Sequence, residues 1–392
     1  MVLKVAHRGQ IPPFIVMDVM RAAAKREAEG ASVLHLEVGQ PSTGLPEGVR
    51  AELARRIMDD TLGYTVALGL DGLRSAIARF YRETQNADVD PARIAITTGS
   101  SAGFVLAFLA AFEAGDRVGL AMPGYPAYRH ILTALGCEPV LIPVGPETRY
   151  QPTVEVLDRL DKPLDGLIVA SPANPTGTVI PPEDLQALVT ACGERGIRLI
   201  SDEIYHGITY GPAAVSTVGM AEHPVVVNSF SKYFCMTGWR LGWLVLPPEL
   251  VRPVECLAQN LFISPPALSQ HAGIIALDHR EAFEGNIQRY ARNRRILLDG
   301  LPAAGLTRFA PADGAFYLYA DVGHLTNNSL DFCARVLNET GIAITPGLDF
   351  DDTDGARWVR FSFCGSTETV ATAVERLTPW LEGRKSSGRA GL

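Results

Sequence analysis

Short apolar runs recur through the first two thirds of the chain, and they do not alternate with polar residues. These runs occupy residues 94–96, 118–121, 140–142, 167–170, 197–200, 225–227 and 241–246. Strands that are buried on both faces have this pattern. Most of the runs are separated by segments with helical spacing, such as residues 182–195. The pattern predicts an α/β fold with a mainly parallel sheet of about seven strands.

The pattern changes after residue 273. An arginine-rich stretch with helical spacing covers residues 281–298, and it is followed by an aromatic run at 316–319, a helical segment near 330–339 and an apolar strand at 358–363. These segments predict a smaller α+β domain. We therefore expect an N-terminal arm of the small domain at residues 1–38, a large domain at 39–280 and the rest of the small domain at 281–392. The tail from Arg384 to Leu392 is expected to be frayed.

Composition narrows the class of protein. The chain has 392 residues, of which 47% are hydrophobic and 20% charged, and its net charge is −8. This balance is typical of a globular protein large enough for two domains, and the acidic excess argues against a nucleic-acid-binding surface. No apolar run reaches the roughly 18 residues that a membrane-spanning helix needs. The N-terminus lacks an export signal, so we expect a cytoplasmic protein.

The cysteines and lysines limit the chemistry further. The six cysteines are widely spaced without a C-x-x-C pair, which favours buried reduced thiols over a disulfide framework or a metal site. Only five of the 35 basic residues are lysines, so a reaction that needs an amine has few candidates.

Polar side chains follow five of the apolar runs at the point where each run ends. Ligands bind beyond the carboxyl ends of the strands in an open parallel sheet, so these side chains are expected to meet. The set combines small hydroxyl residues at the start of a helix, an aromatic ring, an amide, a carboxylate with a phenol, and a lysine. Its members are Ser100 and Ser101, Tyr125, Asn174, Asp202 with Tyr205, and Ser229, Ser231 and Lys232.

This set suits a pyridine ring that carries an aldehyde and a phosphate. A lysine can form a Schiff base with the aldehyde, a carboxylate can hold the ring nitrogen protonated, and a helix N-terminus with hydroxyl groups can hold the phosphate. Pyridoxal 5'-phosphate meets each of these requirements. A dinucleotide cofactor is disfavoured, because the G-x-G-x-x-G pattern is missing after the first run.

Four ordered motifs resemble the class I/II pyridoxal-phosphate-dependent aminotransferases of fold type I. The longest is the lysine segment Ser229–Gly242, which reads SFSKYFCMTGWRLG. The others are Ser171–Gly177 (SPANPTG), Asp202–Tyr205 (DEIY), and Gly63-Tyr64-Thr65 followed by Gly69 and Gly72-Leu73-Arg74. The resemblance extends from Gly39 to Arg360, and it implies a large domain with a mainly parallel sheet and a smaller α+β domain.

The resemblance implies a catalytic role for Lys232, Asp202 and Tyr205. Lys232 is expected to form the Schiff base with the cofactor and then to move the proton between the α-carbon of the substrate and the cofactor. Asp202 is expected to pair with the pyridinium nitrogen. Tyr205 and Asn174 are expected to hydrogen-bond the ring oxygen. For Asn174 a role in forming the turn before Pro175 is an alternative that can coexist with this one.

The phosphate group is expected to bind backbone N–H groups, hydroxyl groups and one guanidinium, whose planar fork suits a dianion. The residues that the resemblance assigns to it are Ser100, Ser101, Ser229, Ser231 and Arg240. It further implies that Tyr64 reaches the phosphate of a neighbouring subunit, which predicts a homodimer with shared active sites.

The substrate is expected to be held by its α-carboxylate. The resemblance gives Arg360 a two-pronged grip on this group, with help from the backbone N–H of Gly39 and from Asn174. Tyr125 is expected to stack on the cofactor ring, although Tyr128, three residues later, is an alternative for the same role.

The leading hypothesis is an aminotransferase that exchanges an amino group between an L-amino acid and a 2-oxo acid by a ping-pong mechanism. The alternative is a C–S β-lyase or another reaction at the α-carbon on the same fold. A catalytically idle cofactor-binding sensor and a nicotinamide dehydrogenase are both disfavoured. The apolar residues Ile11–Phe14, Phe262 and Ile263 hint at a substrate with a neutral or aromatic side chain, and plain packing explains them equally well.

Overall fold

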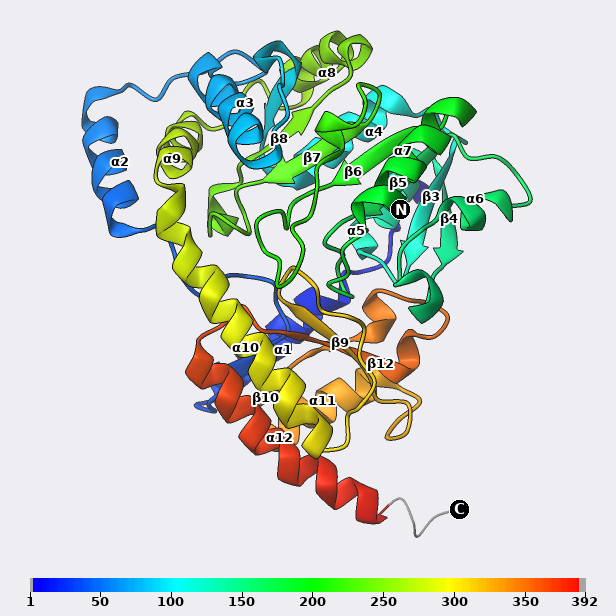
Figure 1. The fold of residues 1–392 in the computed structure, drawn as a ribbon. Helices are drawn as coiled ribbons and strands as arrows, with labels where there is room; N and C mark the ends of the chain where they lie inside the picture. The colour runs from blue at the N-terminus through cyan, green and yellow to red at the C-terminus, as the bar shows by residue number, and fades with distance from the viewer. Residues whose placement is uncertain (1–2, 388–392) are drawn as a thin grey trace.

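A seven-stranded sheet forms the centre of the larger part of the molecule (Figure 1). The computed structural model describes residues 3–387, with the side chains of residues 384–387 excepted. The strands follow the order β2 (Ile94–Thr97), β8 (Gly242–Val245), β7 (Val225–Ser229), β6 (Arg198–Asp202), β5 (Gly166–Ala170), β3 (Arg117–Met122) and β4 (Glu138–Pro143). Only β8 runs antiparallel to its neighbours in this sheet. The predicted mainly parallel α/β sheet is confirmed, and each of the apolar runs forms one of its strands.

Helices cover both faces of this sheet. One face packs against α4 (Gly99–Ala111), α5 (Pro126–Leu135) and α8 (Pro248–Leu261). The other face packs against α3 (Asp71–Gln85) and α9 (Ala267–Asp278) at one end and α7 (Pro182–Arg195) at the other. The helices α2 (Glu47–Asp59) and α6 (Val154–Asp158) lie further out. Burial on both faces explains why the strands are continuous apolar runs.

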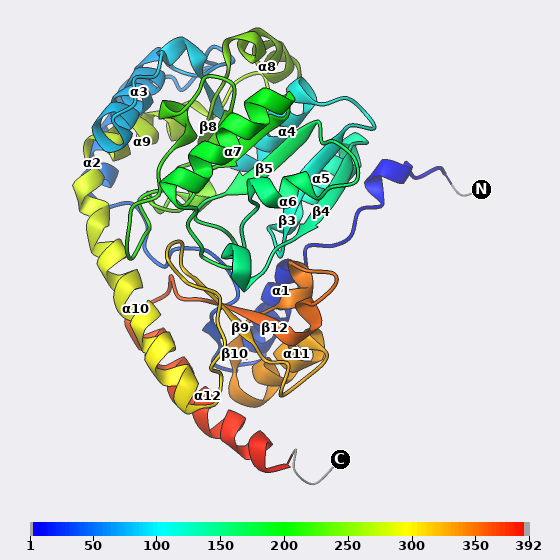
Figure 2. The same ribbon diagram turned by 45° about the vertical axis from the view of Figure 1, so that its right-hand side comes forward.

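The smaller part contains two short sheets. The strands β11 (Thr345–Pro346), β12 (Trp358–Ser362) and β9 (Tyr317–Asp321) form an antiparallel sheet, and β1 (Leu34–His35) pairs in parallel with β10 (Ile342–Ala343). The surrounding helices are α1 (Ile15–Ala28), α10 (Glu284–Ala303), α11 (Ser329–Thr340) and α12 (Thr367–Ser387). Figures 1 and 2 show α10 along one edge, extending from the larger part to the smaller one.

The N-terminal arm packs with elements from the end of the chain. Helix α1 contacts β10 and β11, and β1 pairs with β10. The division into an arm at residues 1–38, a large domain at 39–280 and a small domain at 281–392 stays a prediction. The tail was expected to fray from Arg384, and this expectation is wrong for residues 384–387, because α12 continues past Gly383 to Ser387. The rest of the predicted frayed tail, residues 388–392, lies outside the described residues.

Two further findings concern the described residues. None of their helices is both long and apolar enough to cross a membrane. The six cysteines are all free thiols, as predicted, although Cys256 is only partly buried.

Candidate active site

A cavity of about 150 Å³ lies at the carboxyl ends of the sheet strands, where the larger and smaller parts meet. Nine of the predicted site residues line it, and they come from both parts. They are Gly39, Ser100, Ser101, Tyr125, Asn174, Asp202, Tyr205, Lys232 and Arg360. The strand ends therefore bring together the side chains that the sequence pattern grouped.

Lys232 lies three residues beyond the end of β7. Its Nζ donates a hydrogen bond to the carbonyl oxygen of Gly39 at 2.7 Å and lies 5.8 Å from the centre of the Tyr205 ring. Burial lowers the pKa of Lys232 to about 8, because the charged ammonium is poorly solvated in the cavity. The lowered pKa raises the fraction of neutral amine near neutral pH, which suits this lysine as a nucleophile and as a base.

Asp202 is the last residue of β6 and is buried. One carboxylate oxygen accepts a hydrogen bond from the Tyr128 hydroxyl, and the other accepts one from the backbone N–H of Ile204 at 3.1 Å. Burial raises the pKa of Asp202 to about 7, and the two hydrogen bonds act against this shift. A buried carboxylate with a raised pKa favours a cationic partner, because a nearby positive charge stabilises the ionised carboxylate and lowers its pKa again.

The two tyrosines that compete for the stacking role differ in their contacts. The hydroxyl of Tyr128 is bound to Asp202, and its ring packs edge-on against Phe104 at 5.1 Å between centroids. Tyr125 is half-buried and packs edge-on against Phe14 at 5.7 Å. Tyr128 thus acts as a fixed partner of Asp202, which leaves the face of Tyr125 as the better candidate for stacking.

The start of α4 forms a narrow cradle beside Arg240. Gly99 has a φ of +74°, and a Cβ at this position would lie 2.5 Å from Nη2 of Arg240. The left-handed φ favours glycine at this position, and a side chain here would displace the guanidinium of Arg240. Ser229 Oγ donates to Ser231 Oγ at 2.9 Å on the neighbouring strand end. Free helix N–H groups, hydroxyl groups and a guanidinium are a donor set that fits a phosphate.

Arg360 is buried on β12 and is held from several directions. Its Nη1 donates to Asn174 Oδ1 at 2.8 Å, and its Nη2 donates to the carbonyl oxygen of Glu37 at 2.5 Å and to Thr345 Oγ1 at 3.2 Å. Its guanidinium also lies 4.2 Å from the centre of the Tyr317 ring. Within the described residues its Nε has no hydrogen-bond partner.

Tyr317 also belongs to the site, although the sequence pattern did not indicate it. Its hydroxyl lies 2.9 Å from the hydroxyl of Tyr205, and a side chain at Gly39 would overlap it. The signal was present in the aromatic run at 316–319, where alternation places Tyr317 and Tyr319 on one face of the strand β9, but the run gave no reason to assign a polar role.

Four other predicted site residues, Tyr64, Ser229, Ser231 and Arg240, do not line this cavity. Phe14 of the N-terminal arm lines the cavity as expected, whereas Phe262 and Ile263 do not. The side chain of Tyr64 is 89% exposed. Phe262 and Ile263 therefore give no support, within this chain's cavity, to the expectation of a neutral or aromatic substrate side chain.

Comparison with known proteins identifies the family. The family model for aminotransferase class I and II matches residues 31–377. The chain belongs to the class I and II aminotransferases. The valine–pyruvate aminotransferase of Mycobacterium tuberculosis is 53% identical over 96% of this chain and 98% of the relative. A crystal structure of an aminotransferase from M. tuberculosis has a TM-score of 0.95 and 52% identity, with 97% of this chain and all of the other chain covered.

A more distant aminotransferase of the family shows how far the substrates can differ. The (5-formylfuran-3-yl)methyl phosphate transaminase of Methanocaldococcus jannaschii is 33% identical over 94% of this chain and 96% of the relative. The predicted family, fold type I and aminotransferase activity are confirmed. The enzyme exchanges an amino group between an amino acid and a 2-oxo acid, and its family depends on pyridoxal phosphate.

Proposed function

We propose that this aminotransferase binds pyridoxal 5'-phosphate in the cavity at the strand ends and transfers the amino group of an apolar L-amino acid to pyruvate. The observation that carries the proposal is the meeting of Lys232, Asp202 and Arg360 in one cavity with an apolar wall. When bound, the cofactor supplies an electron sink that makes the α-proton of the substrate removable and carries the amino group between the two substrates.

We assign five side chains of this chain to the cofactor and a sixth to the orientation of one of them. Lys232 holds it covalently and afterwards serves as the base that moves the α-proton, since its lowered pKa makes the neutral amine accessible. Asp202 faces the ring nitrogen, and Tyr128 fixes the orientation of its carboxylate. Tyr125 stacks on the ring, and Tyr205 and Asn174 bind the ring oxygen.

The phosphate is assigned to the cradle at the start of α4. Its donors are Ser100 and Ser101 at the helix N-terminus, Ser229 and Ser231 on the neighbouring strand end, and Arg240. The narrow approach at Gly99 supports this assignment, because it brings the helix N-terminus and the guanidinium of Arg240 together.

Arg360 binds the α-carboxylate of the substrate. Its contacts to Asn174, Glu37 and Thr345 hold the guanidinium in place, and its Nε is free of partners within the described residues. The backbone N–H of Gly39 and the side-chain amide of Asn174 are assigned to the same carboxylate as further hydrogen-bond donors. A bidentate pair of this kind fixes the orientation of the substrate as well as its affinity.

The substrate side chain is assigned to the apolar wall. Phe14, Val16 and Met17 from the start of α1 and Ile131 from α5 line the cavity. This wall suits an uncharged side chain. The relative from M. tuberculosis is a valine–pyruvate aminotransferase, so valine and pyruvate are the first pair to test.

The active unit is proposed to be a homodimer. The exposed side chain of Tyr64 has no role in its own subunit's cavity, which fits the assignment of this phenol to the phosphate site of a second copy.

The test is a transamination assay with single L-amino acids and pyruvate, read as formation of alanine and of the matching 2-oxo acid. We expect valine and other apolar amino acids to react and aspartate to react poorly. Release of ammonia from a cysteine-like substrate without alanine formation would instead identify a β-lyase. Efficient turnover of aspartate would contradict the assigned substrate class.

A further inference from the structure

A second cavity of about 230 Å³ is lined by Tyr233, which follows Lys232 in the chain, and it shares no lining residue with the substrate cavity. It is formed by α3, by the loop that follows β6 and by the start of α10. The residues that shape it include Phe80, Thr84, His206, Ala213, Arg280 and Glu284. It has room for more than a few solvent molecules, since a water takes about 30 Å³ in the liquid.

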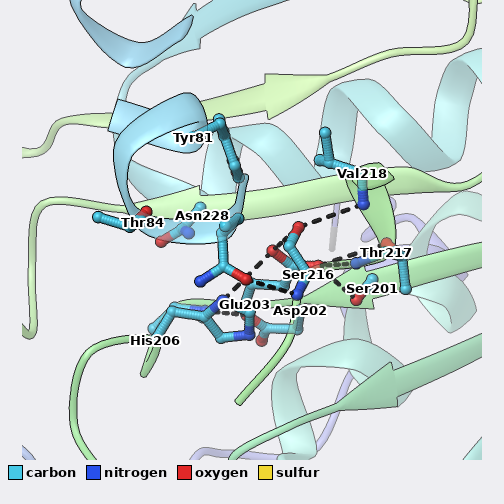
Figure 3. Close-up of polar contacts among 12 residues, drawn as sticks. Tyr81, Thr84, Ser201, Asp202, Glu203, His206, Ser216, Thr217, Val218 and Asn228 are labelled. Carbon is cyan, nitrogen blue, oxygen red and sulfur yellow. Dashed lines mark hydrogen bonds and ion pairs between the residues drawn. The ribbon is translucent and has the colours of Figure 1, made fainter. Parts of the chain in front are cut away.

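His206 is a buried residue in the wall of this cavity. Its side chain is 5% exposed, and its Nδ1 lies 3.5 Å from Oε2 of Glu203. Within the described residues its Nε2 is buried and has no hydrogen-bond partner. Figure 3 shows His206 at the edge of the network around Glu203, whose carboxylate also accepts hydrogen bonds from the hydroxyl groups of Ser201 and Ser216. The imidazole thus lies against Glu203 through one nitrogen, and its other nitrogen is covered by the surrounding atoms.

Charges of both signs border the same cavity. The side chain of Arg280 is 33% exposed, and its guanidinium lies 5.9 Å from the centre of the Phe80 ring. Its Nη1 has no hydrogen-bond partner among the described residues, and its nearest recorded carboxylate oxygen, on Glu83, is 4.0 Å away. Glu284 accepts a hydrogen bond from the hydroxyl of Tyr233 with one oxygen, which leaves its second oxygen for a ligand.

We propose that this cavity binds a free α-amino acid that regulates the enzyme. A zwitterion complements the two charged groups: its carboxylate pairs with Arg280, and its ammonium donates to Glu284. The ring of Phe80 and the methyl groups of Ala213 and Ala214 then face its side chain. A ligand with only one charge would pair with only one of these two groups.

The cavity is linked to the active site through two residues that directly follow catalytic ones. Tyr233 follows Lys232, and its ring packs so closely on Gly207 that a Cβ there would lie 2.6 Å from the ring. Glu203 follows Asp202 and is the carboxylate that holds His206 (Figure 3). A ligand that moves His206 or Tyr233 therefore acts on the backbone that carries Asp202 or Lys232. The regulatory effect rests on the proposed roles of these residues, whereas the binding itself does not.

The test is calorimetric titration of the twenty L-amino acids, one at a time, into borohydride-reduced holoenzyme, in which transamination is blocked. Binding is compared in the wild type, in Arg280→Gln and in Ala213→Trp, which fills the cavity from an exposed position. We expect at least one amino acid to bind, with an affinity that falls roughly ten- to hundred-fold in Arg280→Gln and is lost in Ala213→Trp. Arg292→Gln, an exposed arginine on α10 outside this cavity, is the matched control and should bind as the wild type does.

The variant Arg360→Gln distinguishes binding at the second cavity from binding at the substrate cavity. The proposal predicts that this variant keeps the signal. If all binding is lost in Arg360→Gln, or survives both Arg280→Gln and Ala213→Trp, the proposed site does not exist. Steady-state assays then test regulation: the bound amino acid should change kcat in the wild type and not in Ala213→Trp. Binding with no effect on kcat would overturn the regulatory role. The calorimetric result can be read even if the proposed substrate class fails, because it needs no turnover.

Discussion

The two halves of the substrate cavity are built differently. The half that we assign to the cofactor lies on adjacent strands of one sheet: Asp202 ends β6, and Ser229 ends β7 three residues before Lys232. The half that we assign to the substrate is assembled from distant segments, since Arg360 on β12 binds Asn174 from the larger part and Phe14 from the N-terminal arm packs on Tyr125. The first half is fixed by the sheet, whereas the second depends on how the smaller part sits on it.

This difference suggests that the two halves have different roles in catalysis and in substrate selection. A sheet with helices on both faces holds its strand ends rigidly, which suits groups that must keep one geometry through the chemistry. A cover made of an N-terminal arm and a small sheet can change its side chains without disturbing the strands. We therefore expect changes in the sheet half to affect the rate of the chemical step, and changes in the cover half to affect affinity and selectivity.

Replacing Lys232 should have the largest effect. Lys232→Ala removes the covalent partner of the cofactor and the base for proton transfer, so we expect kcat to fall by roughly 10³-fold or more. The measurement is transamination of the best amino acid with pyruvate, together with the absorbance of the bound cofactor. Lys162→Ala, in the loop before β5, is the control and should behave as the wild type. A Lys232→Ala variant with normal turnover would refute the central assignment.

Replacing Asp202 should change how the stability of the cofactor-free protein depends on pH. The pKa of Asp202 is raised to about 7 in the fold from an ordinary value of 3.8, so the folded state binds this proton more tightly than the unfolded state does. The resulting stability is fully present below pH 3.8 and is lost as the pH rises through 7. It corresponds to at most about 4 kcal/mol of unfolding free energy.

Chemical denaturation of the cofactor-free protein between pH 4 and 8 measures this effect. We expect Asp202→Asn to flatten the profile, because asparagine does not titrate. The exposed Asp299 provides the matched control, and Asp299→Asn should keep the profile of the wild type. If Asp202→Asn leaves the slope unchanged, the raised pKa belongs to another group.

Replacing Arg360 should mainly weaken substrate binding. Arg360→Gln removes charge-assisted hydrogen bonds to the α-carboxylate, so we expect the KM of both the amino acid and the oxo acid to rise roughly hundred-fold. The cofactor should remain bound, which its absorbance reports. Arg292→Gln serves again as the control. A fall in kcat with unchanged KM would mean that Arg360 acts in the chemical step. It would contradict the expectation that the substrate half affects mainly affinity.

The same difference explains what the sequence could predict. The strands of the large sheet were predictable because burial on both faces makes each one an uninterrupted apolar run, and the residues just beyond them were therefore predictable too. The choice between Tyr125 and Tyr128 was not, because it depends on the contact of Tyr128 with Asp202, 74 residues away. Tyr317 was missed for the same reason, since its partner Tyr205 lies 112 residues away in the chain.

The smallest expected effect concerns selectivity at the cover. The ring of Phe14 forms part of the apolar wall and packs edge-on against Tyr125, so Phe14→Ala enlarges the cavity on the side opposite the sheet. A larger cavity leaves a short branched side chain with fewer contacts and gives a bulky side chain more room. Hydrophobic pockets discriminate by about 1–3 kcal/mol per missing or added group, which sets the size of the effect. We expect the ratio of kcat/KM for phenylalanine to that for valine to rise about ten-fold.

This ratio is measured with single amino acids and pyruvate, and Met58→Ala, which removes a side chain that is 84% exposed, is the control. If the ratio rises while the cofactor absorbance and its pH dependence stay as in the wild type, selectivity resides in the cover and is separable from the sheet. An unchanged ratio would mean that the start of α1 only closes the cavity. Residues of the larger part, such as Ile131, would then determine which substrate side chain is accepted.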